Sequence, residues 1–294
     1  MAGKRTISSR VADLLITIVM LSAALVCFFP FLYVFNNSIS DPVLVTGKQI
    51  YFIPKGIQFQ AYRIVLSSKS LFTAYGNTLI YTAVGTLLGT LVTLLCAYPL
   101  SRPRLLGKRF LSLFFLITMY FSGGMIPSFL MMNLYGLYDT RWAILLPAAF
   151  SCYNMIVART YFSSIQEEIL ESARIEGAND LYIFFRVVVP LSKPIVAVIC
   201  LYNAVYMWNV YFNALLYLPS TDLQPLQVFL NKMLTTNSAG TTGGAMSGGS
   251  GLDSSLISEQ IKYPAIVVTI VPILFVYPFV QKHFAKGVML GALK

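Results

Sequence analysis

Residues 167–180 concentrate acidic side chains to an unusual degree. Five of the eleven aspartates and glutamates of the whole protein lie here, at Glu167, Glu168, Glu171, Glu176 and Asp180. Carboxylates can transfer protons, bind metal ions or pair with a basic surface on another molecule. Catalysis or metal binding would also need a nucleophile with its base, or a cluster of ligating side chains. The stretch therefore indicates a contact surface unless such partners exist elsewhere.

The remaining sequence supplies no such partners. Its one histidine is His283, and no CxxC or His-rich spacing accompanies the four cysteines, which lie far apart inside apolar runs at Cys27, Cys96, Cys152 and Cys200. We expect these cysteines to be small buried hydrophobes without metal or disulfide. A complete phosphate-binding loop is also missing, because GKR at 107–109 and GKQ at 47–49 lack its other residues. The sequence therefore predicts no catalytic residues, no metal site and no cofactor in this chain.

The composition is that of a membrane protein. The chain is 57% hydrophobic and only 11% charged, with a mean hydropathy of +0.72, whereas soluble domains carry about 25% charged residues. The net charge of +10 fits basic loops that orient a protein in a bilayer, and the basic residues do not form the aromatic-rich patches of a nucleic-acid-binding fold. We therefore expect lipid contacts and no nucleic-acid partner.

Six apolar stretches are long enough to cross a bilayer as helices. They cover residues 12–36, 73–99, 110–131, 142–161, 193–217 and 263–281. The first is too long for the apolar part of a signal peptide. The third contains SGGMIP at 122–127, so we expect that helix to break or tilt there. The predicted fold is an all-α integral membrane protein with six transmembrane helices in a single domain, residues 1–294.

The basic residues predict the orientation. With both termini in the cytoplasm, two thirds of the 21 lysines and arginines lie on the cytoplasmic side, as the positive-inside rule requires. This N-in, C-in topology makes 162–192 a cytoplasmic loop and makes 37–72 and 218–262 outer loops. The second outer loop contains a Gly/Ser-rich tract at 238–251, which is typical of a flexible segment. It is either a tolerated insertion or a contact for a partner outside the cell.

The acidic stretch predicts a short helix–turn–helix. Ile169, Leu170, Ala173 and Gly177 fall near one helix face, and Glu167, Glu168, Glu171 and Arg174 fall on the other. Gly177 suits a left-handed C-terminal cap, and Asn179 or Asp180 can cap the next helix. A helix lying on the membrane surface is the alternative. Because such helices favour basic polar faces, an acidic face fits a protein partner better.

The spans contain no Asp, Glu, Lys, Arg or His except at their ends, where Asp13, Arg159 and Lys193 lie. Proton-driven carriers usually keep ionisable groups near the midplane, so their absence argues against that class. A sodium-coupled carrier remains an alternative, because carbonyl and hydroxyl oxygens can hold sodium. An assembly factor without a solute path is a third interpretation.

At the acidic stretch the sequence also resembles a known family. ESARIEGAND at 171–180, followed by FFRVVVP at 184–190, is similar to the EAA loop of permease subunits in binding-protein-dependent ABC importers. Ser172 and Val189 depart mildly from that pattern. The stretches AYPLSRPRLLGKR (97–109), GNTLIYTAVGT (76–86), FSGGMIPSFLMMNLYGLYDTRWAILLP (121–147) and QKHFAKGVMLGALK (281–294) resemble the carbohydrate-uptake branch, including the shorter maltose-transporter permease and bacterial complex-oligosaccharide permeases.

The resemblance implies a type I permease fold in the bacterial cytoplasmic membrane, and a loop at about 165–180 that couples to an ATPase. By matching motif positions, Glu171 would make a polar contact, Ala173 would allow close packing and Gly177 would form the turn. The full set of implied coupling residues is Glu171, Ser172, Ala173, Glu176, Gly177, Ala178 and Pro190. The implied partners are a homologous second permease subunit, two cytoplasmic ATPase subunits that bind ATP and magnesium, and an extracytoplasmic sugar-binding protein. The implied activity is ATP-driven import of oligosaccharides by alternating access.

The fifth predicted span suggests a path for the sugar. Tyr202, Tyr206, Asn209 and Asn213 recur at i, i+4, i+7 and i+11, which would place them on one helix face. Aromatic rings and amides suit the apolar faces and hydroxyls of a sugar. The alternative is that they hydrogen-bond neighbouring helices as packing contacts. Asn77, Tyr120 and Asn154 are weaker candidates for the same path.

Overall fold

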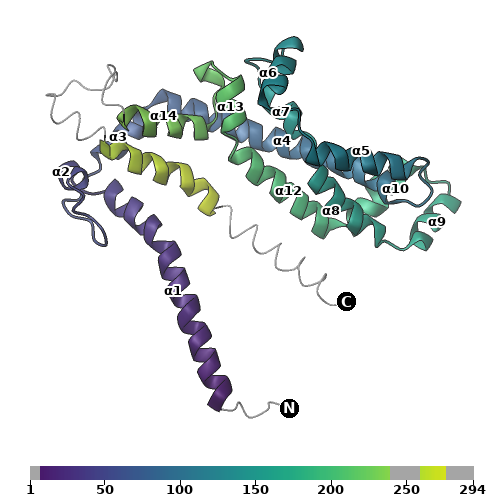
Figure 1. Cartoon of the computed structure of the whole chain (residues 1–294), viewed down its shortest axis with the longest axis horizontal. Helices are drawn as coiled ribbons and strands as arrows, with labels where there is room; N and C mark the ends of the chain where they lie inside the picture. The colour runs from purple at the N-terminus through teal and green to yellow at the C-terminus, as the bar shows by residue number, and fades with distance from the viewer. Residues whose placement is uncertain (1–6, 239–258, 276–294) are drawn as a thin grey trace. The chain divides into compact units, whose positions relative to one another are not determined.

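The computed structural model describes residues 7–238 and 259–275 (Figure 1), and these residues form helices connected by turns, without strands. The chain divides into two compact units. The first comprises Met1–Ser68 and Leu230–Val271, and the second comprises Lys69–Phe229 and Pro272–Lys294. Each unit is described by itself.

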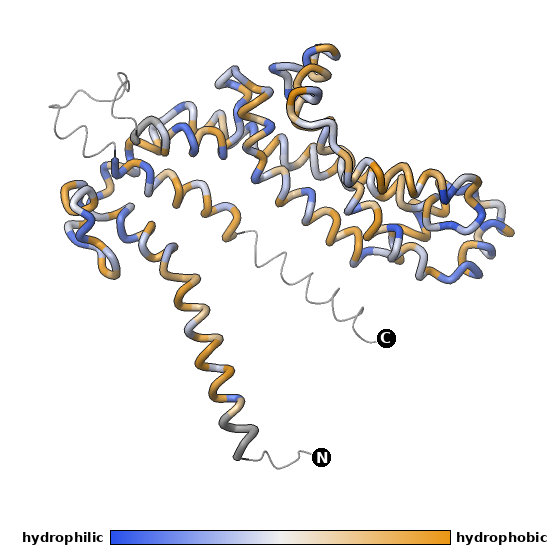
Figure 2. Tube along the Cα trace, in the orientation of Figure 1, coloured by the Kyte–Doolittle hydropathy of each residue, from blue (hydrophilic) through white to orange (hydrophobic). Residues whose placement is uncertain are grey.

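The first unit is built on α1 (Ile7–Ser38), which is apolar along most of its length (Figure 2). α1 is followed by α2 (Pro42–Thr46), α3 (Gln60–Ser67) and, later in the chain, a helix over residues 259–275. At the end of α1 lies a buried polar cluster, in which the side chain of Gln260 donates hydrogen bonds to the carbonyls of Asn37 and Ser40. These bonds join the 259–275 helix to the end of α1.

The loop after α1 is folded rather than loose. Asp41 caps α2 by accepting a hydrogen bond from the backbone N–H of Val43 at 2.8 Å, and its own backbone N–H donates to the carbonyl of Lys55 at 3.0 Å. The side chain of Gln58 also donates to Asp41 at 3.2 Å. The segment QIYFIPKGIQFQ (49–60) in this loop is irregular, with bends at residues 51–53 and 56, until α3 begins.

The second unit is a helical bundle. Its elements are α4 (Lys69–Ser101), α5 (Lys108–Tyr120), α6 (Met125–Leu134), α7 (Trp142–Ala148), α8 (Cys152–Ser163), α9 (Glu167–Ile175), α10 (Asp180–Ile183), a π-helical turn (Phe184–Val188), α11 (Val189–Leu191), α12 (Lys193–Trp208), α13 (Phe212–Tyr217), a 3₁₀ turn (Thr221–Leu223) and α14 (Leu226–Ser238), whose second half belongs to the first unit. α4, α8 and α12 pack side by side, and α5 lies against α8 (Figure 1).

Two glycines one helical turn apart let α4 and α12 approach closely. A Cβ at Gly85 would lie 2.7 Å from the sulfur of Met207, and one at Gly89 would lie 3.1 Å from the amide nitrogen of Asn203. Small residues at such crossings bring backbones together in membranes, where packing and hydrogen bonds replace the hydrophobic effect. The long α4 therefore forms the central element of the bundle.

The predicted spans agree with the helices in part. By length and composition, three described helical segments could cross a membrane: Ala12–Ser38, Lys69–Ser101 and Trp142–Ser163. The number rises to five if each of two bent pairs counts as one span. One bent pair is α5 with α6, which meet at 110° where SGGMIP predicted a break. The six-span count and the N-in, C-in topology remain predictions.

Two expectations need correction. The predicted span 193–217 is not one helix, because α12 ends at Trp208 and α13 begins at Phe212. Nor are the cysteines buried: all four are free, Cys27 is exposed, and Cys96, Cys152 and Cys200 are partly exposed. The end of the span predicted at 263–281, beyond residue 275, and the Gly/Ser tract beyond residue 238 lie outside the described residues.

Candidate functional site

The acidic stretch folds as α9, a turn and α10, which we call the elbow (residues 165–183). α9 carries Glu167 and Glu168 in its first turn and Arg174 in its last turn. Both placements complement the helix dipole, which favours negative charge at the N-terminus and positive charge at the C-terminus. The polar sequence of α9 is thus compatible with a stable short helix.

Apolar side chains of both helices hold the elbow to the bundle, with Leu170 of α9 and Ile183 of α10 fully buried. Leu170 is fully buried in a core that includes Phe162 and Phe184. Ala173 packs at the edge of that core, but Ile169 is 40% exposed. The predicted apolar face of α9 was therefore too wide.

The turn has the predicted conformation. Gly177 has φ = +84°, a left-handed value that side chains other than glycine rarely adopt. Asn179 then caps α10, because its side-chain oxygen accepts a hydrogen bond from the backbone N–H of Tyr182 at 2.7 Å. These residues reverse the chain between the two helices.

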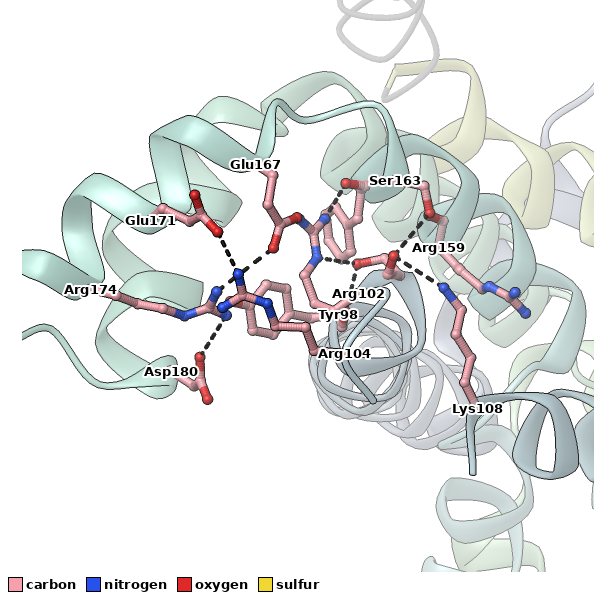
Figure 3. Close-up of polar contacts among 12 residues, drawn as sticks. Tyr98, Arg102, Arg104, Lys108, Arg159, Ser163, Glu167, Glu171, Arg174 and Asp180 are labelled. Atoms are coloured by element: carbon pink, nitrogen blue, oxygen red, sulfur yellow. Dashed lines mark hydrogen bonds and ion pairs between the residues drawn. The ribbon is translucent and has the colours of Figure 1, made fainter. Parts of the chain in front are cut away.

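Arg102 connects the elbow to the end of α4 (Figure 3). Its guanidinium is buried, donates to Ser101 Oγ at 2.8 Å and to the carbonyl of Phe162, and pairs with Glu167 at 3.3 Å. It also lies 5.6 Å from the ring centre of Tyr98. A buried charge is tolerated only when paired and hydrogen-bonded, and Arg102 meets this condition through contacts on three segments.

Two further arginines pair with the acidic residues. Arg104 reaches Glu171 at 2.5 Å, and Arg174 reaches Asp180 at 3.3 Å and Glu167 at 3.7 Å. Partial burial works to lower the pKa of Arg174, but its hydrogen bond and charge interaction with Asp180 raise that pKa overall. The guanidinium therefore stays charged within the network.

The sequence did not predict this network. In the sequence, Arg102 and Arg104 contribute only to the count of basic loop residues, and Glu167 and Arg174 are predicted on the polar face of the helix without an internal partner. In the structure both side chains are only about a third exposed and pair with each other. The sequence does contain one indication of this network. One predicted cytoplasmic segment has an excess of acidic residues, and another carries the basic residues of RPR at 102–104.

The solvent-exposed surface of the elbow is partly apolar. Ile175 is 87% exposed, and Leu181 and Tyr182 are also exposed. Among the predicted coupling residues, Ser172, Glu176, Gly177 and Pro190 are exposed, and Glu171, Ala173 and Ala178 are partly exposed. An exposed cluster of large apolar side chains beside acidic groups is typical of a protein contact.

The predicted solute-path residues do not share one helix face. Tyr202 and Tyr206 lie on α12 and are exposed, Asn209 caps the end of that helix, and Asn213 lies on the separate α13. The amide of Asn209 donates to the carbonyl of Val205 at 2.8 Å. The i, i+4, i+7, i+11 argument is therefore wrong beyond Trp208, because the helix ends there.

Two of the weaker candidates are occupied by internal bonds. The Asn77 amide donates to the carbonyls of Asp222 and Gln224 and accepts from Arg141. The Asn154 amide donates to Asn203 at 3.1 Å, and Asn203 donates to Thr90 at 3.2 Å. These geometries match the packing alternative for both asparagines.

Tyr120 lies at the end of α5 and is 74% exposed. Tyr202 faces Tyr153 of α8, with ring centres 6.5 Å apart. Tyr202 and Tyr206 are thus exposed aromatic side chains of one helix. No group of three or more His, Cys, Asp or Glu residues within the described segments could hold a metal ion.

An all-helical bundle with an acidic elbow at its end defines a class of membrane permease. Residues 1–290 match the family described as "Binding-protein-dependent transport system inner membrane component". The chain therefore belongs to this family of inner membrane components of ABC importers.

Among curated proteins, the chain is 40% identical to the polygalacturonan/rhamnogalacturonan transport system permease protein YtcP of Bacillus subtilis, over 97% of this chain and 99% of that one. It is 34% identical to Protein LplC of the same organism, over 98% and 97% of the two chains. Among solved structures, it is 36% identical to a chain of a bacterial ABC transporter that imports the acidic polysaccharide alginate, with a TM-score of 0.85 over 95% of this chain and 99% of that one. These relatives favour the importer over a sodium-coupled carrier.

Proposed function

We propose that this chain is one of two different permease subunits in an ATP-driven importer of acidic oligosaccharides. The observation that carries the proposal is its full-length similarity to permeases described for polygalacturonan/rhamnogalacturonan and for alginate. Each of these polymers is negatively charged, because galacturonate and the sugars of alginate carry a carboxylate. Acting without enzymatic chemistry of its own, this subunit would pass oligosaccharide from an extracytoplasmic binding protein to the cytoplasm.

In this proposal the elbow docks into a separate ATPase. Supporting features are its exposed apolar side chains, with Ile175 the most exposed, and its acidic residues. ATP and magnesium would bind the two ATPase subunits, whose closure would move the elbow. A partner shifts a conformational equilibrium only if it binds the two states differently, and ATP-driven closure would supply that difference.

Arg102 would carry the motion from the elbow into the membrane. It bonds the Phe162 carbonyl at the end of α8 and Glu167 at the start of α9, while its own backbone follows α4 directly. Displacement of α9 would therefore pull on the ends of α4 and α8 together. Arg102 is a positioning residue in this account.

The exposed rings of Tyr202 and Tyr206 are the part of the predicted solute path that we retain. Aromatic faces stack on the C–H surfaces of sugars, and both of these rings are exposed on α12. Asn209 and Asn213 stay in the proposal only as neighbours at the end of α12. Asn77 and Asn154 contribute less to the proposed solute path, because their amides are hydrogen-bonded within the bundle. Tyr120 also stays a weaker candidate.

The test is reconstitution of the complete importer in vesicles with its second permease, ATPases and binding protein. We expect ATP-dependent uptake of labelled oligogalacturonate or oligoalginate, and much slower uptake of an uncharged oligosaccharide such as raffinose. Uptake driven by a sodium gradient without ATP would contradict the proposed mechanism. ATP-driven uptake of raffinose alone would contradict only the acidic-substrate assignment.

A further inference from the structure

The loop after α1 carries an exposed apolar tip at Tyr51, Phe52 and Ile53. Phe52 and Ile53 are 69% and 71% exposed. Three large apolar side chains in a row at the surface of an otherwise hydrogen-bonded loop indicate an interaction surface. The bonds from Asp41 to Lys55 and from Gln58 to Ile39 close this loop at its base, so its tip is held in place.

Ring contacts fix the tip against α1. The ring of Phe52 lies 5.4 Å from that of Phe29, and the ring of Tyr51 lies 6.4 Å from that of Tyr33. Tyr33 also makes an edge contact with Tyr263 at 6.2 Å. All five residues belong to the first unit, so the contacts are internal to it.

The depth of these contacts follows from the geometry of α1. A bilayer core accommodates about 20 helical residues. If the hydrocarbon core begins just after Asp13, the last charged residue of α1, its other boundary lies at about Tyr33. Tyrosines gather at membrane interfaces, and Tyr33, Tyr51 and Tyr263 lie together at this level. Phe29 lies about one helical turn, or roughly 6 Å, deeper.

We propose that residues 51–53 insert into the lipid leaflet at the Ser38 end of α1, with Tyr51 at the interface and Phe52 and Ile53 among the acyl chains. The exposed apolar surface of α1 continues onto Phe52 through the ring contact with Phe29. Lys48 and Lys55 flank the tip and suit the anionic headgroups above it. With the N-terminus in the cytoplasm, this is the outer leaflet.

The occupant is lipid rather than protein because of the depth. A soluble binding protein cannot reach a ring that contacts α1 one turn below the tyrosine level, whereas acyl chains surround α1 there. The tip would then fix the height of the outer loop in the bilayer. Amphipathic segments anchor in this way by burying apolar side chains at the headgroup boundary.

The experiment uses Phe52→Trp in the complete importer, in nanodiscs of phosphatidylethanolamine and phosphatidylglycerol. The parent complex supplies the background of Trp142, Trp208 and the other subunits. Ile57→Trp is the matched control, since Ile57 is 62% exposed and lies in the same loop outside the Tyr51–Ile53 tip. Ile53→Trp is a second test position if Phe52→Trp fails to assemble.

We expect lipid brominated on its acyl chains to quench the added fluorescence of Phe52→Trp, and aqueous iodide to quench that of Ile57→Trp. Equal iodide quenching at both positions would overturn the proposal. Protection of Phe52→Trp from both quenchers would also overturn it, by indicating a contact with the second permease. Protection from iodide only after addition of the binding protein would show a docking surface for that protein instead.

Discussion

The guanidinium of Arg104 lies 2.5 Å from the carboxylate of Glu171, the residue at the first position of the coupling motif. The Arg104 side chain is 67% exposed and that of Glu171 is 46% exposed, and solvent-exposed ion pairs contribute only about 0–1 kcal/mol. Glu171 can therefore exchange Arg104 for a basic group on the ATPase at little cost.

A charge swap distinguishes two possible roles of Glu171, the internal ion pair with Arg104 and the proposed contact with the ATPase. We expect Glu171→Arg to reduce transport-coupled ATPase activity by about tenfold, which corresponds to about 1.4 kcal/mol of lost contact, and the double variant Glu171→Arg/Arg104→Glu to remain impaired. Asp222→Lys, a charge reversal at an exposed position outside the elbow, is the control. Full recovery in the double variant would mean that the internal ion pair is the only function of Glu171.

The left-handed turn at Gly177 gives a second prediction. Gly177→Val forces a β-branched residue to φ = +84°, at a cost of roughly 1–2 kcal/mol, although a Cβ there meets no other atom within 4 Å. We expect assembly with the ATPase to weaken while the bundle stays folded, as measured by co-purification and thermal unfolding in detergent.

Gly136 provides the matched control for that turn, because it has φ = +66° and equally open surroundings. Gly136→Val should cause a similar loss of thermal stability without loss of ATPase association. If both variants weaken association to the same extent, the effect of Gly177→Val is general destabilisation.

Replacement of Arg102 tests the link between the elbow and α4. Arg102→Met removes a buried donor from the Phe162 carbonyl and leaves Glu167 with its longer 3.7 Å contact to Arg174. Removing one member of a fully buried pair costs about 3–5 kcal/mol, which is the upper limit for this partly exposed pair. Thermal unfolding should shift strongly downward, and the residual folded complex should hydrolyse ATP without transport. Arg109→Met, at an exposed position of α5, should change neither quantity.

The buried chain of Asn154, Asn203 and Thr90 gives a prediction about stability in the membrane. Asn203→Ala removes both hydrogen bonds, and interhelical bonds in membranes are worth about 0.6–2 kcal/mol each. Unfolding in detergent should require less denaturant. Asn209→Ala, which loses only a bond within its own helix, is the control, and an equal effect would contradict a packing role specific to Asn203.

The features that the sequence predicted correctly are those with local signals. Gly177 predicts a left-handed turn, because few other residues tolerate a positive φ, and Asn179 shortly after it predicts a helix N-cap. SGGMIP similarly marked the bend between α5 and α6. The apolar length of α1 and α4 sufficed to recognise membrane helices.

The errors arose where distant residues decide the structure. WNVYFN at 208–213 contains neither proline nor glycine, and Asn209 is the one weak signal of a helix end in it. The helix stops there, and Val210 is buried in the core of the bundle. The role of Arg102 likewise depends on partners 60 and 65 positions away, which no local pattern reveals.

The central claim is that the elbow contacts a separate ATPase, and a photo-cross-linking amino acid at Ile175 tests it most directly. Ile175 is the most exposed large apolar residue of the elbow, so the probe leaves the internal ion pairs intact. We predict a cross-link from Ile175 to the ATPase subunit in the assembled importer, and none from the same probe at Ile57 in the outer loop. A cross-link from Ile175 to the extracytoplasmic binding protein, or the absence of any ATPase adduct in an active complex, would contradict the account.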